Sequence, residues 1–389
     1  MTARGEPDTL GSTSQVRVLL AIKTLGPGGA EHLLADLVGG RGDDAFEYEV
    51  AHVLADSDAL APVVRSQGVP VHSLGATSNL DWRWLPAFRR LLVAGEFDIV
   101  HFHLPMTAAL GRPVVATLPR EKQPITLYTE HSLWNKVSPL VKALNGATIS
   151  RDRGLIAVSD AAFDALPHRL QGRAQVVVHG VDLSASRAMA DQRDHLRAAI
   201  RSELEIPSGE LLAVTVAGLR AEKGYDVLLQ TAHLLGDREV PIRFVAAGSG
   251  PLEEELAARR RQLGLDGRFR FLGHRDDTLA LMTAADVVVL PSHQEGLPVV
   301  LMEATSVGAP IVATAVGGVP QVITDDVNGL VVPPGRPDLL ADALERLSVD
   351  RGVRERLGKQ AAADSTRFDI ARARSEIEIL YRRALGRRS

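Results

Sequence analysis

The segment 287–303 reads VVVLPSHQEGLPVVLME and predicts a buried strand, a loop and then a helix. Its first four residues are apolar, as in a strand that is covered on both faces. Pro298 suits the first turn of the helix, because proline lacks the N–H that an intrahelical bond would need. Parallel α/β sheets are built from such units, so the segment indicates a doubly wound fold.

Two acids frame the predicted helix start, Glu295 before it and Glu303 in its second turn. Four backbone amides should point out of this helix start without a partner, those of Gly296, Leu297, Val299 and Val300. Because the helix dipole adds partial positive charge there, such a start binds phosphate. With two carboxylates beside it, the segment predicts a site for a nucleotide diphosphate sugar. An ordinary strand–helix unit with solvated acids is the alternative.

The composition is that of a globular protein with more than one domain. A chain of 389 residues is too long for one ordinary core, so we expect two domains. A net charge of -4 argues against a general nucleic-acid-binding protein. The chain has no cysteine, which excludes disulfides and thiolate metal sites.

The sequence predicts neither a signal peptide nor a membrane-spanning helix. Residues 1–15 are polar and are expected to form a flexible tail, since they lack the apolar core of a signal peptide. No apolar run approaches the roughly 18 residues that span a bilayer. We therefore expect a cytoplasmic protein, or one that is peripheral at the inner face of the membrane.

Apolar strand patterns alternate with helical patterns along the whole chain. The predicted strands of the first half are 16–22, 48–54, 69–74, 98–104, 125–131, 155–159 and 175–179. Those of the second half are 212–217, 243–247, 269–272, 287–290, 310–313 and 330–332. We expect two Rossmann-like doubly wound domains that face a cleft, 16–185 and 186–367, with the break in the small and polar region 182–194. An amphipathic helix at 368–389 should pack back on the first domain.

Three further loops follow predicted strands and suit a phosphate or a sugar. Gly29 lies in a glycine turn, 26–29, where backbone amides can approach an anion closely. Arg220 and Lys223 follow the first strand of the second half, and two cations there could hold a diphosphate. Gly250 lies in the next glycine loop. A tight turn and a solvated basic loop are the alternatives, but these loops should meet at the carboxyl edges of the sheets, where ligands bind.

The histidines fall at strand ends. His131 ends a predicted strand, where it could hydrogen-bond a substrate hydroxyl or phosphate, or act only as a packed side chain. His101 and His103 flank Phe102 on another strand, and we expect only one of them to face a given side. No metal-binding spacing is present, so we expect neither a metal nor another cofactor.

The region 83–173 raises the prospect of a membrane partner. It holds 12 Lys and Arg against 7 Asp and Glu, with aromatic residues near its start. A basic face of this kind can meet an anionic membrane peripherally. A plain amphipathic helix on the first sheet is the alternative that we prefer.

With these loops in place, the chain resembles the retaining nucleotide-sugar glycosyltransferases of family four, which have the two-domain GT-B architecture. The likeness runs from Val16 to Leu385 and is most specific in the Glu-x7-Glu pair, Glu295 and Glu303. It is supported by Lys223-Gly224, by the stretch 308–318 (GAPIVATAVGG), by the glycine loop 28–31 and by Val158-Ser159.

The resemblance implies a role for each candidate residue. Glu303 would bind the ribose hydroxyls of a UDP- or GDP-sugar, and Glu295 would contact the transferred hexose. Lys223 and an arginine would neutralise the leaving diphosphate, with no metal required. The acceptor, a glycan, lipid or small metabolite with a free hydroxyl, would lie near His131. The new bond would form on the face from which the leaving group departs.

The chain departs from the family pattern at two positions. Gly218 stands where the family usually has arginine, which makes Arg220 the candidate substitute. His179 replaces the usual asparagine of an Asn-Gly-Val-Asp turn. Two other functions stay open: a GT-B epimerase that uses Glu130 as an acid–base group, and a non-catalytic protein that binds sugar nucleotides.

Overall fold

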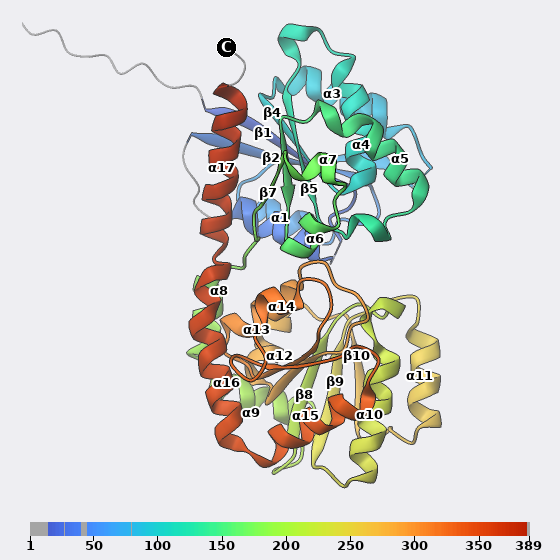
Figure 1. Ribbon diagram of the computed structural model, residues 1–389, viewed down its shortest axis with the longest axis vertical. Helices are drawn as coiled ribbons and strands as arrows, with labels where there is room; N and C mark the ends of the chain where they lie inside the picture. The colour runs from blue at the N-terminus through green and yellow to red at the C-terminus, as the bar shows by residue number, and fades with distance from the viewer. Residues whose placement is uncertain (1–14, 27, 40–44, 79, 387–389) are drawn as a thin grey trace, which may run out of the picture.

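The computed structural model describes residues 15–26, 28–39, 45–78 and 80–386, which form two α/β domains stacked along the long axis (Figure 1). The predicted tail lies outside the described residues except for Gln15. The first domain is built on a seven-stranded parallel sheet with the order β3-β2-β1-β4-β5-β6-β7. Its strands are β1 (Val16–Ile22), β2 (Phe46–Leu54), β3 (Val71–Ala76), β4 (Ile99–His103), β5 (Ile125–Glu130), β6 (Gly154–Ala157) and β7 (Ala174–Val176). Its helices are α1 (Gly29–Gly39), α2 (Ala61–Ser66), α3 (Trp84–Gly95), α4 (Pro105–Ala116), α5 (Pro139–Thr148), α6 (Asp160–Asp164) and α7 (His168–Gln171), with 3-10 turns at Arg120–Lys122, Trp134–Lys136 and Ile149–Arg151.

The second domain is built on a six-stranded parallel sheet with the order β10-β9-β8-β11-β12-β13. Its strands are β8 (Leu211–Val216), β9 (Ile242–Ala247), β10 (Phe269–Gly273), β11 (Val287–Leu290), β12 (Ile311–Thr314) and β13 (Leu330–Val332). The helices from the domain break onward are α8 (Leu183–Ala190), α9 (Arg193–Glu203), α10 (Tyr225–Asp237), α11 (Glu253–Gln262), α12 (Thr278–Ala284), α13 (Val299–Ser306), α14 (Val319–Val322), α15 (Pro337–Val349), α16 (Arg351–Asp364) and α17 (Ile370–Gly386), with 3-10 turns at Ala221–Lys223 (η4) and Ser365–Phe368 (η5).

The predicted fold class is confirmed: both sheets are parallel and both are covered by helices on two faces. All the predicted strands are present, with ends that move by at most three residues. In β1, alternate side chains point to opposite faces. Leu19 packs in the cluster that contains Phe88 of α3, whereas Leu20 packs in the cluster that contains Leu34 of α1 and Tyr381 of α17. Burial on both faces explains why this strand is apolar throughout.

The region 182–194 contains a helix rather than only a polar connection. Asp182 caps α8, because its carboxylate accepts hydrogen bonds from the amides of Ser184 and Ala185. A side chain that satisfies the free amides of the first turn stabilises the start of a helix in a sequence of small residues.

The two segments that connect the domains are bonded to each other. The amide of Val181 donates to the carbonyl of Phe368 at 2.9 Å, and the amide of Ile370 donates back to Val181 at 3.2 Å. From there α17 runs along the first domain (Figure 1), where the hydroxyl of Tyr381 lies 2.7 Å from His101 Nδ1 and Arg374 Nε donates to the carbonyl of Leu37. Among the helices of the described residues, none is long and apolar enough to cross a membrane.

Candidate functional site

Glu295 lies at the centre of the candidate site, in the loop between β11 and α13. Its carboxylate accepts hydrogen bonds from Lys223 Nζ at 2.8 and 2.9 Å and from Ser292 Oγ at 2.6 Å. Only 7% of Glu295 is exposed. Lys223 ends η4, directly after β8, and reaches Glu295 because β8 and β11 are neighbours in the sheet. The predicted cation and carboxylate are therefore brought together.

The segment that follows β12 packs against the loop of Glu295 and holds it in place. The amide of Gly318 donates to the carbonyl of Gly296 at 2.7 Å. Gly317 has a φ of +51°, and a Cβ on it would lie 1.8 Å from the carbonyl oxygen of Glu295. Only glycine fits this conformation and this contact. The glycine pair near the end of the 308–318 stretch thus positions the catalytic candidate.

The helix start keeps the free amides that the sequence predicts. Within the described part of the chain, the amides of Gly296, Leu297, Val299 and Val300 donate to no backbone acceptor. Leu297 and Val299 are themselves 8% exposed. Unpartnered amides at a helix start attract an anion.

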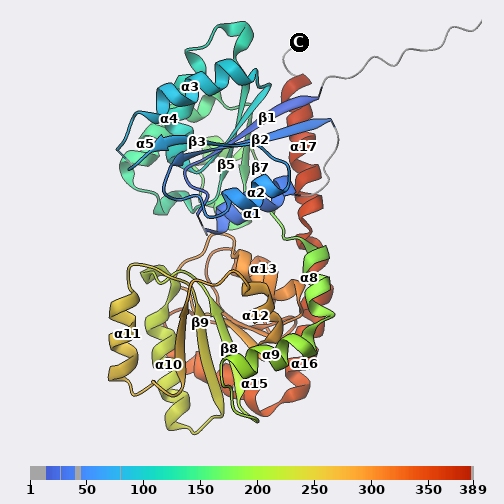
Figure 2. The ribbon, with the colours of Figure 1, turned by 180° about the vertical axis from the view of Figure 1, so that it is seen from behind.

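The first domain closes over this helix start. A Cβ on Gly296 would lie 2.7 Å from the carbonyl oxygen of His131, and one on Gly29 would lie 3.5 Å from Val299 Cγ2. Figure 2 shows α1 at the lower end of the first domain and α13 at the upper end of the second. The structure therefore places Gly29, His131, Gly296 and Val299 together at the domain interface.

Arg220 and Gly250 lie at the side of the site. Their loops are bonded, since the amide of Leu219 donates to the carbonyl of Ser249 at 3.0 Å. Gly250 lies against the backbone of Leu219, where a Cβ would meet the carbonyl oxygen at 2.4 Å. The exposed guanidinium of Arg220 has no hydrogen-bond or ion-pair partner among the described residues, so it is available to an anion. Burial raises the pKa of Glu31 in the first domain, and the charge of Arg220 is one of the influences that lower it.

Glu303 faces a second carboxylate across the domain interface. It lies in the second turn of α13, as predicted, and α1 of the first domain packs against this helix. Burial and the nearby charge of Asp36 raise the pKa of Glu303 to about 8. Burial and Asp182 raise the pKa of Asp36 to about 6, and Arg374 opposes this. Near neutral pH, Glu303 is thus held mostly as the neutral acid until a ligand favours its ionised form.

Four histidines form a row of neighbouring, tilted rings at the carboxyl end of the first sheet. Neighbouring ring centroids lie 4.5 Å apart for His101 and His103, 5.2 Å for His103 and His131, and 5.7 Å for His131 and His179. His103 Nδ1 and His131 Nε2 share a hydrogen bond of 2.9 Å. Burial lowers the pKa of His131 well below its usual value, and His103 and His179 lower it further. His131 is therefore a neutral imidazole at pH 7.

The expectation that His101 and His103 face different sides was wrong. Positions i and i+2 of a strand share a face, so both rings point the same way from β4. Their partners were not visible in the sequence. His101 Nε2 lies 2.7 Å from Oγ1 of Thr129, which lies on β5 and follows 28 residues later in the chain.

Glu130 does not reach the interface as an acid–base group. It is fully buried, and its two carboxylate oxygens accept from the hydroxyl of Tyr128 at 2.8 Å and from the amide of Ser132 at 3.0 Å. Burial raises the pKa of Glu130 to about 7. Both oxygens serve the fold, which removes the main residue that an epimerase would need.

Two parallel α/β domains that are joined by a double connection and closed over a helix start with free backbone amides have the GT-B architecture of glycosyltransferases. Family models agree: "Glycosyltransferase Family 4" matches residues 27–185, and "Glycosyl transferases group 1" matches residues 197–364. A D-inositol 3-phosphate glycosyltransferase of Xylanimonas cellulosilytica is 33% identical, over 76% of this chain and 74% of that protein. The chain belongs to glycosyltransferase family 4.

Other relatives agree with this class. The alpha-D-kanosaminyltransferase of Streptomyces kanamyceticus is 28% identical, over 71% of this chain and 72% of that protein. Anabaena HepE in complex with UDP-glucose has a TM-score of 0.80 at 21% identity, covering 94% of this chain and 98% of that one. Sucrose-phosphate synthase from Thermosynechococcus elongatus has a TM-score of 0.75 at 19% identity, over 95% and 99% of the two chains. At these identities the two structures show the fold alone.

Sequence reasoning missed two groups that complete the site. Ser292 bonds Glu295 from three positions earlier in the same loop, a spacing that could have indicated it. Asp36 influences Glu303 from the other domain, and no local pattern points to that contact.

Proposed function

We propose that the protein is a retaining glycosyltransferase that moves a hexose from a nucleotide diphosphate sugar to a hydroxyl-bearing acceptor. One observation carries the proposal: Glu295, bonded to Lys223 and Ser292, lies beside four free amides and opposite His131. Amides, ammonium and carboxylate together match a ligand that is anionic in its diphosphate and rich in hydroxyls in its sugar.

Each group has a part in binding the donor. The amides of the helix start and Lys223 bind the diphosphate, and the unpaired guanidinium of Arg220 replaces the arginine that is missing at Gly218. Glu303 accepts hydrogen bonds from the ribose hydroxyls, which favours its ionised form. Glu295 accepts a hydrogen bond from a hydroxyl of the transferred sugar. The positive charge comes from side chains, so we propose that no metal is needed.

The reaction breaks the bond between the anomeric carbon and the diphosphate oxygen. The acceptor oxygen bonds to the same carbon on the same face, and its proton passes to the departing phosphate oxygen. Lys223, Arg220 and the amides stabilise the negative charge that grows on the diphosphate, the largest single contribution that a protein makes in such steps. Neutral His131 orients a hydroxyl at the other side of the interface.

The comparisons favour particular substrates. HepE was solved with UDP and with UDP-glucose, which supports a uridine nucleotide as donor. The relatives are named for transfer to D-inositol 3-phosphate and for transfer of kanosamine. We therefore favour a small, hydroxyl-rich metabolite over a glycan or a lipid as acceptor.

A thermal-shift panel of UDP, GDP, ADP and their sugars, with and without a chelator, tests the proposal. A ligand that binds only the folded protein raises its melting temperature. We expect a shift with one nucleotide family that the chelator leaves unchanged, followed by slow release of nucleoside diphosphate from the matching sugar. No shift with any nucleotide would refute the proposal, and reversible epimer formation would favour the epimerase instead.

A further inference from the structure

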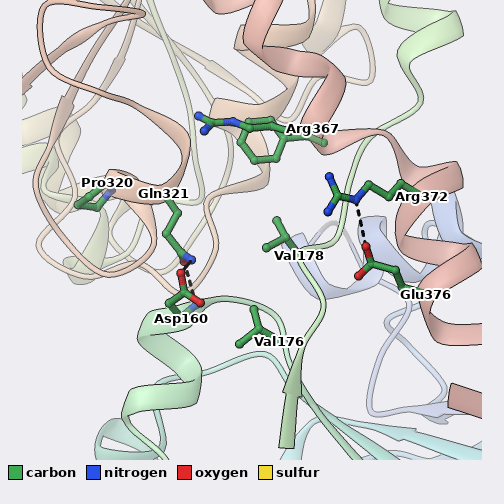
Figure 3. Close-up of a pocket in the computed structure, with 9 residues that line it drawn as sticks. Asp160, Val176, Val178, Pro320, Gln321, Arg367, Arg372 and Glu376 are labelled. Atoms are coloured by element: carbon green, nitrogen blue, oxygen red, sulfur yellow. Dashed lines mark hydrogen bonds and ion pairs between the residues drawn. The ribbon is translucent and has the colours of Figure 1, made fainter. Parts of the chain in front are cut away.

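Asp160 and Gln321 join the two domains directly. Asp160 is the first residue of α6 in the first domain, and Gln321 lies in α14 of the second. The amide of Asp160 donates to Gln321 Oε1 at 3.1 Å, and Gln321 Nε2 donates to the Asp160 carboxylate. Figure 3 shows the two side chains pointing toward each other. In the opposite orientation of the glutamine amide, its NH2 group would face the N–H of Asp160 and its oxygen would face the carboxylate, so the observed orientation is the one that allows both hydrogen bonds.

The Asp160–Gln321 pair lies away from the two segments that connect the domains. A pocket of about 500 Å³ lies between the pair and the connecting segments, with Asp160 and Gln321 on one side and with Val178 and Arg372 of α17 on the other (Figure 3). The hydrogen bonds between Asp160 and Gln321 lie at a distance from the connecting segments. They therefore oppose the opening of the two domains more effectively than a contact beside those segments would.

Both ends of the pair lead to the catalytic candidates. On the second domain, α14 directly follows Gly318, whose amide bonds Gly296 beside Glu295. On the first domain, Ser159 caps α6 and is fully buried, and it follows β6, the neighbour of β5, which ends one residue before His131. A change in the Asp160–Gln321 bonds therefore changes how closely Gly296 and His131 approach each other.

We propose that Asp160 and Gln321 form an interdomain latch and act as positioning residues that set the closed arrangement for sugar transfer. The catalytic part of this inference rests on the proposed function. The latch needs an uncharged glutamine, because a carboxylate at position 321 would face the carboxylate of Asp160 with no proton between them.

Gln321→Glu tests the latch, and Asp160→Asn in the same chain restores it. In the single variant, two carboxylates repel, so we expect a larger radius of gyration in X-ray scattering. We expect kcat/KM for the slow release of UDP from UDP-glucose to fall about tenfold, the effect of losing one hydrogen bond to a charged group. In the double variant, glutamate accepts from the amide of residue 160 and from the asparagine side chain, so both values should return toward the wild type.

Gln360→Glu is the matched control. Gln360 Nε2 donates to Asp364 Oδ1 at 2.8 Å within α16, so this variant creates the same repulsion inside one helix. We expect it to leave the scattering and the release of UDP from UDP-glucose unchanged. Three outcomes would overturn the latch: unchanged scattering of Gln321→Glu, equal defects in Gln360→Glu, or no rescue by Asp160→Asn. The scattering arm needs no substrate, so it decides the latch even if the nucleotide panel refutes the proposed function.

Discussion

Gly317→Ala should displace the loop of Glu295 while leaving the second domain folded. A Cβ at this position would lie 1.8 Å from the carbonyl oxygen of Glu295, whereas real Cβ contacts are essentially never below 3.0 Å. The loop must therefore shift by about 1.2 Å. Misplacement of a catalytic group by about 1 Å costs roughly 100-fold in rate. The positive φ of +51° adds about 1–2 kcal/mol of backbone strain.

Gly335→Ala separates the clash from the strain. Gly335 has a φ of +73°, but a Cβ there would meet nothing within 4 Å. In urea unfolding, Gly335→Ala should lose only the stability that the strain costs, and Gly317→Ala should lose at least as much. Only Gly317→Ala should lose turnover of the nucleotide sugar and affinity for the nucleotide by calorimetry. Turnover and nucleotide affinity of Gly317→Ala that match those of Gly335→Ala would show that the loop of Glu295 is not the site.

Three further changes test the charged groups. Lys223→Ala should lower turnover at saturating donor by about 100- to 1,000-fold, because it removes positive charge from the diphosphate and leaves buried Glu295 with Ser292 alone. Lys223→Arg, which keeps the charge, is the control. A rate of Lys223→Ala above one tenth of the wild-type rate would contradict the role of Lys223. Glu303→Gln tests the raised pKa: the folded-state value of about 8 lies above the usual 4.5, so the stability from this group is present below about pH 4.5 and is lost as the pH rises to 8. The variant should match the wild type in urea unfolding at about pH 4 and exceed it by about 2–4 kcal/mol at pH 8, and equal curves at both pH values would disprove the raised pKa of Glu303. Arg112→Leu should cost about 3–5 kcal/mol of unfolding free energy, because its side chain and that of Asp152 are 0% and 1% exposed and form an ion pair at 2.7 Å; partial recovery in Arg112→Leu/Asp152→Leu would confirm the cause, and an undiminished unfolding midpoint in the single variant would refute it.

The fold could be predicted because its signals are local. Apolar runs such as 287–290 mark strands, and the proline and glycine that follow mark the loop and the helix start. In a parallel sheet these loops all lie at one edge, so Lys223 and Glu295 could be expected together although 72 residues separate them. The predicted strand ends differ from the observed ones by up to three residues, because the chain direction at a sheet edge depends on the packing of the next helix.

The sequence by itself determined the parallel architecture and the Glu-x7-Glu helix start, because both depend on the spacing of residues within one strand–loop–helix unit. The tertiary structure alone decided the contacts between units. It placed the ring of His103 beside that of His101 and bonded it to His131, set the carboxylate of Asp36 near Glu303, and joined Asp160 to Gln321. Each of these contacts depends on the relative position of two strands or two domains. The physical reason is that the long-range packing of many side chains sets that position, and no short pattern records it.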